Sequence, residues 1–183
     1  MHLTSQKPLS TLAKSLQLND WETLVHHIKH LPYSRNANRD DFSLVLKEHQ
    51  GSCSSKHALL KAIALENNWD HIKLVLAIFK MNSQNTAKLS PVLDKHQVNF
   101  IPEAHCYLQI NDTFLDITNA NSDFSKIKQD IIETQYIEPH QVVDYKVEYH
   151  KRFLKSWLES TLSQYSFEDF WSIREQCITT LSQ

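Results

Sequence analysis

The sequence contains a single glycine among 183 residues, Gly51. Glycine is the residue that most readily adopts a positive φ angle, so almost every turn in this chain must manage without it. Asn and Asp tolerate such angles better than most residues do, and Asn is plentiful in the expected turns "NAN", "NNW" and "QINDT". We therefore expect positive φ angles to be rare or to fall on Asn and Asp.

Long apolar runs and a strong net charge are also missing. No run approaches the roughly 18–20 apolar residues that span a bilayer, and the N-terminus lacks the apolar region of a secretory signal. The net charge of −2 gives no electrostatic reason to expect a nucleic-acid or membrane partner. Three widely spaced cysteines are a poor disulfide framework, which suits a reducing compartment. The composition predicts a cytoplasmic globular protein.

Hydrophobic patterning predicts that the first third of the chain is helical. A helical pattern over residues 8–31 is broken in two near Asp20, a good N-cap residue. A second helix is expected from Cys53 to Asn67, with Ser52 as its N-cap. The short apolar segment 42–46 is left unassigned.

The middle of the chain predicts strands, and the last third predicts helices. Residues 71–81 form a β-branched and aromatic run typical of a strand, and a long irregular polar connection follows over residues 82–102. Residues 104–118 resemble a hairpin that turns at Asn111-Asp112. Two C-terminal helices follow, the second capped by Ser166.

These elements predict an α+β fold in which a central helix packs on a small antiparallel sheet. The length suits one domain with a substantial core, residues 1–183. Within it, residues 48–119 carry the central helix and the strands. Residues 1–47 and 120–183 are expected to be mainly helical flanks.

Cys53 stands at the expected entrance of the central helix, two residues after Gly51. A thiolate there meets unsatisfied N–H groups and the positive end of the helix dipole, and both lower a cysteine pKa. Gly51 can turn the backbone sharply and leave room for substrate beside the sulfur. The alternative is that Gly51 serves a tight turn and that Cys53 is a small buried apolar residue.

The hairpin supplies a base and an orienting acid, which a nucleophilic cysteine needs. If Asn111-Asp112 is a two-residue turn, Tyr107 lies opposite Asp116. The alternation of side chains then places His105 and Asp116 on one face as diagonal neighbours. A turn of different parity would separate them.

"GSCSSKHALL" followed by "EAHCYLQINDTFLDIT" resembles the core of the transglutaminase-like superfamily, relatives of papain-fold cysteine enzymes. That resemblance covers roughly residues 48–119 and implies a papain/transglutaminase-like core. It further implies Cys53 as the nucleophile, His105 as the base and Asp116 as the orienting acid of a catalytic triad.

Three further positions bear on the resemblance. Phe114 and Thr118 match the aromatic before the acid and the threonine after it, and Tyr107 is the aromatic after the histidine. The sequence departs from the family in having tyrosine at 107 where tryptophan is usual. It also has a short spacing between His105 and Asp116 and a long polar loop before His105.

The resemblance implies a cysteine enzyme that acts on an amide of a peptide, protein or small molecule through a thioester acyl-enzyme. Peptidase, amidase, deamidase and acyl transferase all remain open, and no cofactor is expected. The alternative is a catalytically silent fold that binds a protein or peptide. A weaker alternative is a redox-sensing thiol, in which Cys53 pairs with Cys106 or Cys177.

Acyl transfer also needs donors for the oxyanion. The backbone N–H of Cys53 is one candidate, and the side chain of Gln50 is the first candidate for the other, followed by Asn38 and Asn36. Gly51 and Tyr107 are the expected substrate-binding residues.

Other chemically capable residues have simpler interpretations. His57, one turn after Cys53, could compete as the base. The "HHIKH" histidines, His26, His27 and His30, place two rings on one helix face, but no motif for a third metal ligand accompanies them. Cys106 and Cys177 are expected to be core residues, and the C-terminal aromatic residues are expected to pack together.

Overall fold

The computed structural model describes residues 1–161 and 164–181. Within these ranges the chain forms seven α-helices and four strands. In chain order they are α1 (Pro8–Ser15), α2 (Trp21–His30), α3 (Leu44–Lys47), α4 (Cys53–Glu66), β1 (Ile72–Asn82), α5 (Ser90–Lys95), β2 (Phe100–Ile110), β3 (Thr113–Leu115), β4 (Ile131–Ile137), α6 (Asp144–Ser160) and α7 (Phe167–Leu181).

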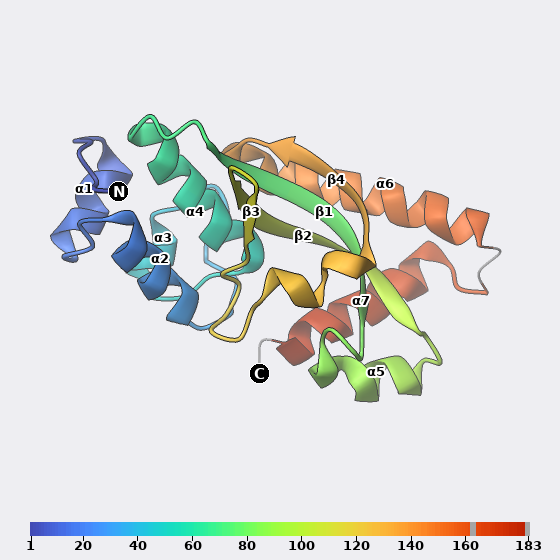
Figure 1. The fold of residues 1–183 in the computed structure, drawn as a ribbon. Helices are drawn as coiled ribbons and strands as arrows, with labels where there is room; N and C mark the ends of the chain where they lie inside the picture. The colour runs from blue at the N-terminus through green and yellow to red at the C-terminus, as the bar shows by residue number, and fades with distance from the viewer. Residues whose placement is uncertain (162–163, 182–183) are drawn as a thin grey trace. The chain divides into compact units, whose positions relative to one another are not determined.

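The strands form one antiparallel sheet with the order β3-β2-β1-β4 (Figure 1). β2 and β3 are joined by the two-residue turn Asn111-Asp112, and Ile110 pairs with Thr113 across it. The α+β fold, the hairpin and its register are therefore confirmed as predicted. Continuing the register by symmetry places Tyr107 opposite Asp116, just beyond the end of β3.

Side-chain caps begin three of the helices where the sequence predicts them. Asp20 accepts a hydrogen bond from the backbone of Thr23 at the start of α2. Ser52 caps α4 in a reciprocal capping box with Ser55. Ser166 accepts the backbone N–H of Asp169 at 3.1 Å at the start of α7.

Two elements differ from the sequence-based expectation. β4 lies inside the C-terminal flank predicted to be mainly helical, and it forms an edge of the sheet. Most of its residues are at least partly exposed, so the strand carries little apolar signal. The connection 82–102 is also less irregular than predicted, since it contains α5 and the start of β2.

Positive φ angles occur at five described residues, and none of them is glycine. Asn68 and Asn111 follow the expectation that asparagine takes this role, and Asn111 does so in the hairpin turn. The other three are Gln17, His49 and Gln97. The prediction was therefore right in part, because side chains less suited to this conformation also adopt it.

The chain divides into two compact units. The first comprises Met1–Leu76, Cys106–Phe124 and Gln135–Val143, and the second comprises Ala77–His105, Ser125–Thr134 and Asp144–Gln183. Strands β1, β2 and β4 each contribute residues to both units, so the boundary does not follow the predicted 48–119 core.

In the first unit, α1 and α2 lie against α4 (Figure 1). The last residue of α4, Glu66, accepts the backbone N–H groups of Leu9 and Ser10 at 3.1 and 2.6 Å. These are the donors that the first turn of α1 leaves without helical partners. In the first unit, α4 is thus the helix on which α1 and α2 pack.

In the second unit, a buried ion pair joins β2 to α7. Arg174 donates from Nε and Nη2 to the two carboxylate oxygens of Glu103 at 2.7 and 2.5 Å. Burial by itself raises the pKa of Glu103, but the Arg174 charge outweighs it and lowers that pKa to about 2. Aromatic side chains of α6 and α7 pack together, as expected, with the rings of Trp157 and Phe170 5.5 Å apart.

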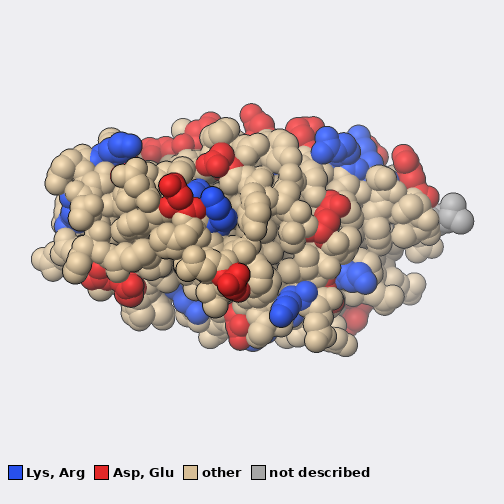
Figure 2. All heavy atoms as spheres, turned by 45° about the horizontal axis from the view of Figure 1, so that its top comes forward, with Lys and Arg blue, Asp and Glu red and all other residues tan. Residues whose placement is uncertain are grey.

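Acidic and basic side chains are interspersed over the face drawn in Figure 2. This agrees with the small net charge of the chain. In the part of the chain that the structure describes, no helix has the length and apolarity to cross a membrane.

Glu103→Gln tests the buried ion pair. The change leaves a buried guanidinium without its counter-charge, so we expect the free energy of unfolding at pH 7 to fall by about 3 kcal/mol. Since the pKa of Glu103 in the folded protein lies below its ordinary 4.5, the stabilisation is complete above pH 4.5 and is lost as the pH falls toward 2. Urea unfolding at several pH values measures this.

The exposed carboxylate of Glu159 on α6 provides the control. Glu159→Gln should change the unfolding free energy by less than about 0.5 kcal/mol. A Glu103→Gln variant that parallels the wild type at every pH would show that the pair contributes nothing to stability.

Candidate functional site

Cys53 is the first residue of α4, directly after the capping box. It is 8% exposed, and its Sγ lies 3.8 Å from the hydroxyl of Ser54. The predicted placement of a cysteine at a helix entrance is therefore confirmed. A thiolate at this position lies at the positive end of the helix dipole, which stabilises it.

The structure gives a different reason for glycine at position 51 from the one that the sequence suggests. Its φ angle is not positive, and its backbone is bound on both sides, with its N–H donating to Pro32 and its carbonyl accepting from Ser34. A Cβ on Gly51 would lie 2.8 Å from Cγ of Lys56 and 3.0 Å from Oγ of Ser55. Gly51 therefore makes room for the stem of a buried lysine, and its part in substrate binding stays a prediction.

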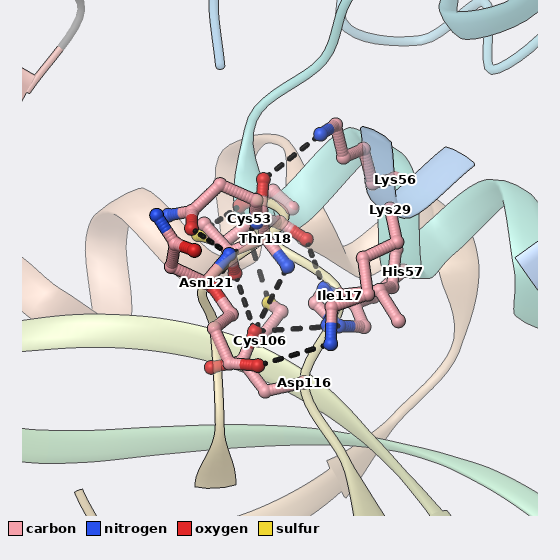
Figure 3. Close-up of polar contacts among 12 residues, drawn as sticks. Lys29, Cys53, Lys56, His57, Cys106, Asp116, Ile117, Thr118 and Asn121 are labelled. Carbon is pink, nitrogen blue, oxygen red and sulfur yellow. Dashed lines mark hydrogen bonds and ion pairs between the residues drawn. The ribbon is translucent and has the colours of Figure 1, made fainter. Parts of the chain in front are cut away.

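Lys56 is fully buried in the first unit, one turn after Cys53. Its ammonium donates to the carbonyl oxygens of Leu31 at 2.6 Å and Thr118 at 2.9 Å (Figure 3). Burial lowers the pKa of Lys56 to about 8, while the charges of Asp116 and Cys53 raise it. Lys56 is therefore a buried cation close to two of the three predicted catalytic residues.

Asp116 follows β3 and is held in a tight polar turn. Its Oδ1 accepts the backbone N–H of Thr118 at 3.0 Å and the hydroxyl of Thr118 at 2.6 Å. The carboxylate is 7% exposed. Thr118 thereby fixes the orientation of the carboxylate, which gives a structural role to a residue that the sequence pattern singled out.

His57 does not fit the role of competing base. It is fully buried, and its Nδ1 lies 2.6 Å from the carbonyl oxygen of Cys53, which can only accept. Its Nε2 accepts the backbone N–H of Ile117 at 2.9 Å. These two partners define the neutral tautomer with the proton on Nδ1. His57 is thus a structural link between α4 and the Asp116 segment, 3.8 Å from the carboxylate oxygen.

His105 lies on β2 and is the last residue of its segment in the second unit. It is partly exposed, and its ring meets that of Phe79 edge-on, with centroids 5.5 Å apart. The strand position is the predicted one. Its pairing with Cys53 and Asp116, which belong to the first unit, stays a prediction.

The side chains predicted to bind the oxyanion differ in how many of their amide hydrogens already donate to other groups. Both amide hydrogens of Asn36 are used, by Glu48 at 2.9 Å and by the carbonyl of Gln50 at 3.0 Å. Within residues 1–161 and 164–181, the side-chain Nε2 of Gln50 makes one bond, to the carbonyl of Arg35 at 3.2 Å, which leaves its second hydrogen for another acceptor. Gln50 therefore remains the first side-chain candidate, while Asn38 is exposed and its Oδ1 accepts the backbone N–H of Asp40.

Tyr107 is 2% exposed within the first unit. Its ring packs against those of Phe114 and Phe124, at centroid distances of 5.9 and 4.8 Å. Burial raises the pKa of Tyr107 to about 12, so the phenol stays protonated at neutral pH. The structure thus places Tyr107 in an aromatic cluster, and its contact with substrate stays a prediction.

The other two cysteines are buried, as expected. Sγ of Cys106 lies 3.9 Å from the hydroxyl of Ser54, on the side of β2 that meets α4. Burial raises the pKa of Cys177 to about 11. The rings of His26 and His30 lie 4.3 Å apart, and no group of three potential metal ligands occurs among residues 1–161 and 164–181.

Sequence reasoning missed Lys56. A signal for it was present, because residues 53, 56, 60 and 63 fall on one face of a helix and the other three are apolar. A lysine in the middle of an apolar helix face indicates a buried charge. The single glycine five residues earlier indicates that the fold leaves room for this side chain.

In comparisons with known proteins, no family model, curated protein or solved structure matches the chain.

A double-mutant cycle tests why Gly51 is glycine. Gly51→Ala should lower the free energy of unfolding by about 1–3 kcal/mol, because the new methyl group overlaps a pinned side chain. In a Lys56→Ala background that cost should shrink by at least about 1 kcal/mol. Urea unfolding of the four proteins measures the coupling. An equal cost in both backgrounds would show that the lysine is not the reason for the glycine.

Proposed function

We propose that the protein is a transglutaminase-like cysteine enzyme that acts on an amide bond. The observation that carries the proposal is the placement of Cys53 at the first position of a capped helix, with the buried Asp116 close to the same helix (Figure 3). The two residues after Asp116 bind this helix, because the backbone N–H of Ile117 donates to His57 and the carbonyl of Thr118 accepts from Lys56. Helix entrances of this kind lower the pKa of a thiol.

In the proposed reaction, Sγ of Cys53 attacks the amide carbonyl and its proton passes to His105. The tetrahedral intermediate collapses to a thioester as His105 gives that proton to the leaving amine. Water then adds to the thioester, with His105 as base, and releases the carboxylic acid and the free thiol. Asp116 keeps the imidazole oriented, and Thr118 keeps Asp116 oriented.

The oxyanion of each tetrahedral intermediate would be bound by the backbone N–H of Cys53 and by the uncommitted amide hydrogen of Gln50. The chemistry needs no metal or cofactor. A primary amine in place of water would give a transferase instead of a hydrolase, so the reaction class is an acyl transfer in either case.

Alkylation of the three cysteines by iodoacetamide, read site by site by mass spectrometry between pH 5 and 9, tests the proposal. Cys53 should react readily at pH 6, because a thiolate–imidazolium pair persists well below the ordinary thiol pKa of about 8.5. His105→Ala should slow this reaction at pH 6 by about tenfold or more. Cys177, whose pKa is raised, serves as the internal reference for a buried thiol.

The matched control is His140→Ala, which removes an exposed histidine of the first unit. It should leave the labelling of Cys53 unchanged. A Cys53 that reacts as an ordinary thiol in the wild type, with no effect of His105→Ala, would rule out the proposed enzyme and leave the silent binding fold as the alternative.

A further inference from the structure

The strongest feature that the proposed chemistry does not use is the buried ammonium of Lys56. It lies one helical turn after Cys53, on the face of α4 that packs inside the first unit. Lysine is almost never fully buried unless its charge is paired and its hydrogens are bound. A side chain this costly to bury calls for a specific role.

The hydrogen bonds of Lys56 join three separate segments. Leu31 follows the last residue of α2, Thr118 follows Asp116, and Lys56 itself belongs to α4. Each carbonyl accepts from the same ammonium, so the three segments are joined at one point. Removing the ammonium takes away one link between the Asp116–Thr118 segment and the helix that carries Cys53, and leaves the bond from Ile117 to His57 as another.

The charge of Lys56 also acts on the site. Asp116 and Cys53 are the two ionisable groups that favour the protonated form of Lys56. The interaction is mutual, so a charged Lys56 favours the thiolate form of Cys53 to the same extent. With a pKa of about 8, Lys56 keeps its charge at neutral and acidic pH, where the thiolate needs support.

From this placement we infer that Lys56 is a positioning residue of the Cys53 site: its buried ammonium holds the Asp116 segment against α4 and stabilises the Cys53 thiolate. The inference rests on the proposed function, because it assigns Lys56 a part in the reactivity of the same cysteine.

Several groups act on Cys53 together. Lys56 comes from α4, along with the N–H groups of the first helical turn and the hydroxyl of Ser54. The Asp116 carboxylate, after β3, carries negative charge and opposes the thiolate. Cys106 on β2 is a buried thiol, and His57 is neutral. Among these side chains, Lys56 is the cation that offsets Asp116.

Lys61 offers a matched comparison on the same helix. It is also buried, at 3% exposure, and its ammonium donates to one backbone carbonyl, that of Ile72, at 2.8 Å. Burial lowers its pKa as well, and neither Cys53 nor Asp116 is among the charges that act on it. Lys61 is thus a control for the effect on stability of removing a buried lysine, because it does not interact with the Cys53 thiol.

The test is the pH profile of Cys53 alkylation in the wild type, Lys56→Met and Lys61→Met, with urea unfolding of each. Lys56→Met should shift the pH profile of Cys53 alkylation upward by about one pH unit, because loss of the ammonium raises the pKa of the thiol. Lys61→Met should lower stability but leave the profile unchanged. Equal profiles for the two variants would overturn the inference and leave Lys56 a structural residue.

Slow, ordinary labelling of Cys53 in the wild type would instead refute the proposed function, so the two failures are distinct. If Lys56→Met does not fold, NMR titration of the lysine side chains in the wild type and Cys53→Ala gives the answer. Removing the thiol should lower the pKa of Lys56 and leave that of Lys61 in place. An unchanged Lys56 titration would overturn the inference equally.

Discussion

The first unit of this protein depends on one buried charge. The ammonium of Lys56 bonds the carbonyls of Leu31 and Thr118, which joins the end of α2 and the segment after β3 to the start of α4. A Cβ on the only glycine in the chain would lie 2.8 Å from the stem of this side chain. This interaction therefore ties the helix that Cys53 opens to the segment that follows Asp116. The capping box at Ser52 and the bonds from Thr118 then set the position of Cys53 and the orientation of the Asp116 carboxylate.

The second unit uses a buried charge differently. Glu103 and Arg174 neutralise each other through two hydrogen bonds, so the pair is satisfied within itself. In the part of the chain that the structure describes, the hydrogen-bond acceptors of Lys56 are two backbone carbonyls, and its charge is offset at longer range by Asp116 and Cys53. The charges of Glu103 and Arg174 neutralise each other within the pair. The charge of Lys56 is not neutralised by a bonded carboxylate, so it also changes the pKa of nearby ionisable groups.

Local signals in the sequence were sufficient for much of the fold. Capping residues marked the starts of α2, α4 and α7, and Asn111-Asp112 marked the hairpin turn and its register. The edge strand β4 was missed because an exposed strand needs few apolar residues, and α5 because a short helix in a polar connection has little periodicity. Lys56 was missed because its role depends on carbonyls distant in sequence, which no local pattern encodes.

The most direct test of the central claim is reaction with an activated ester, p-nitrophenyl acetate, which needs no substrate recognition. The account predicts a rapid burst of nitrophenol, an acetyl group on Cys53 detected by mass spectrometry, and slower turnover as water releases it; Cys53→Ser should abolish the burst. Acetylation confined to surface lysines, with no burst and no difference between the two proteins, would contradict the assignment of Cys53 as a nucleophile.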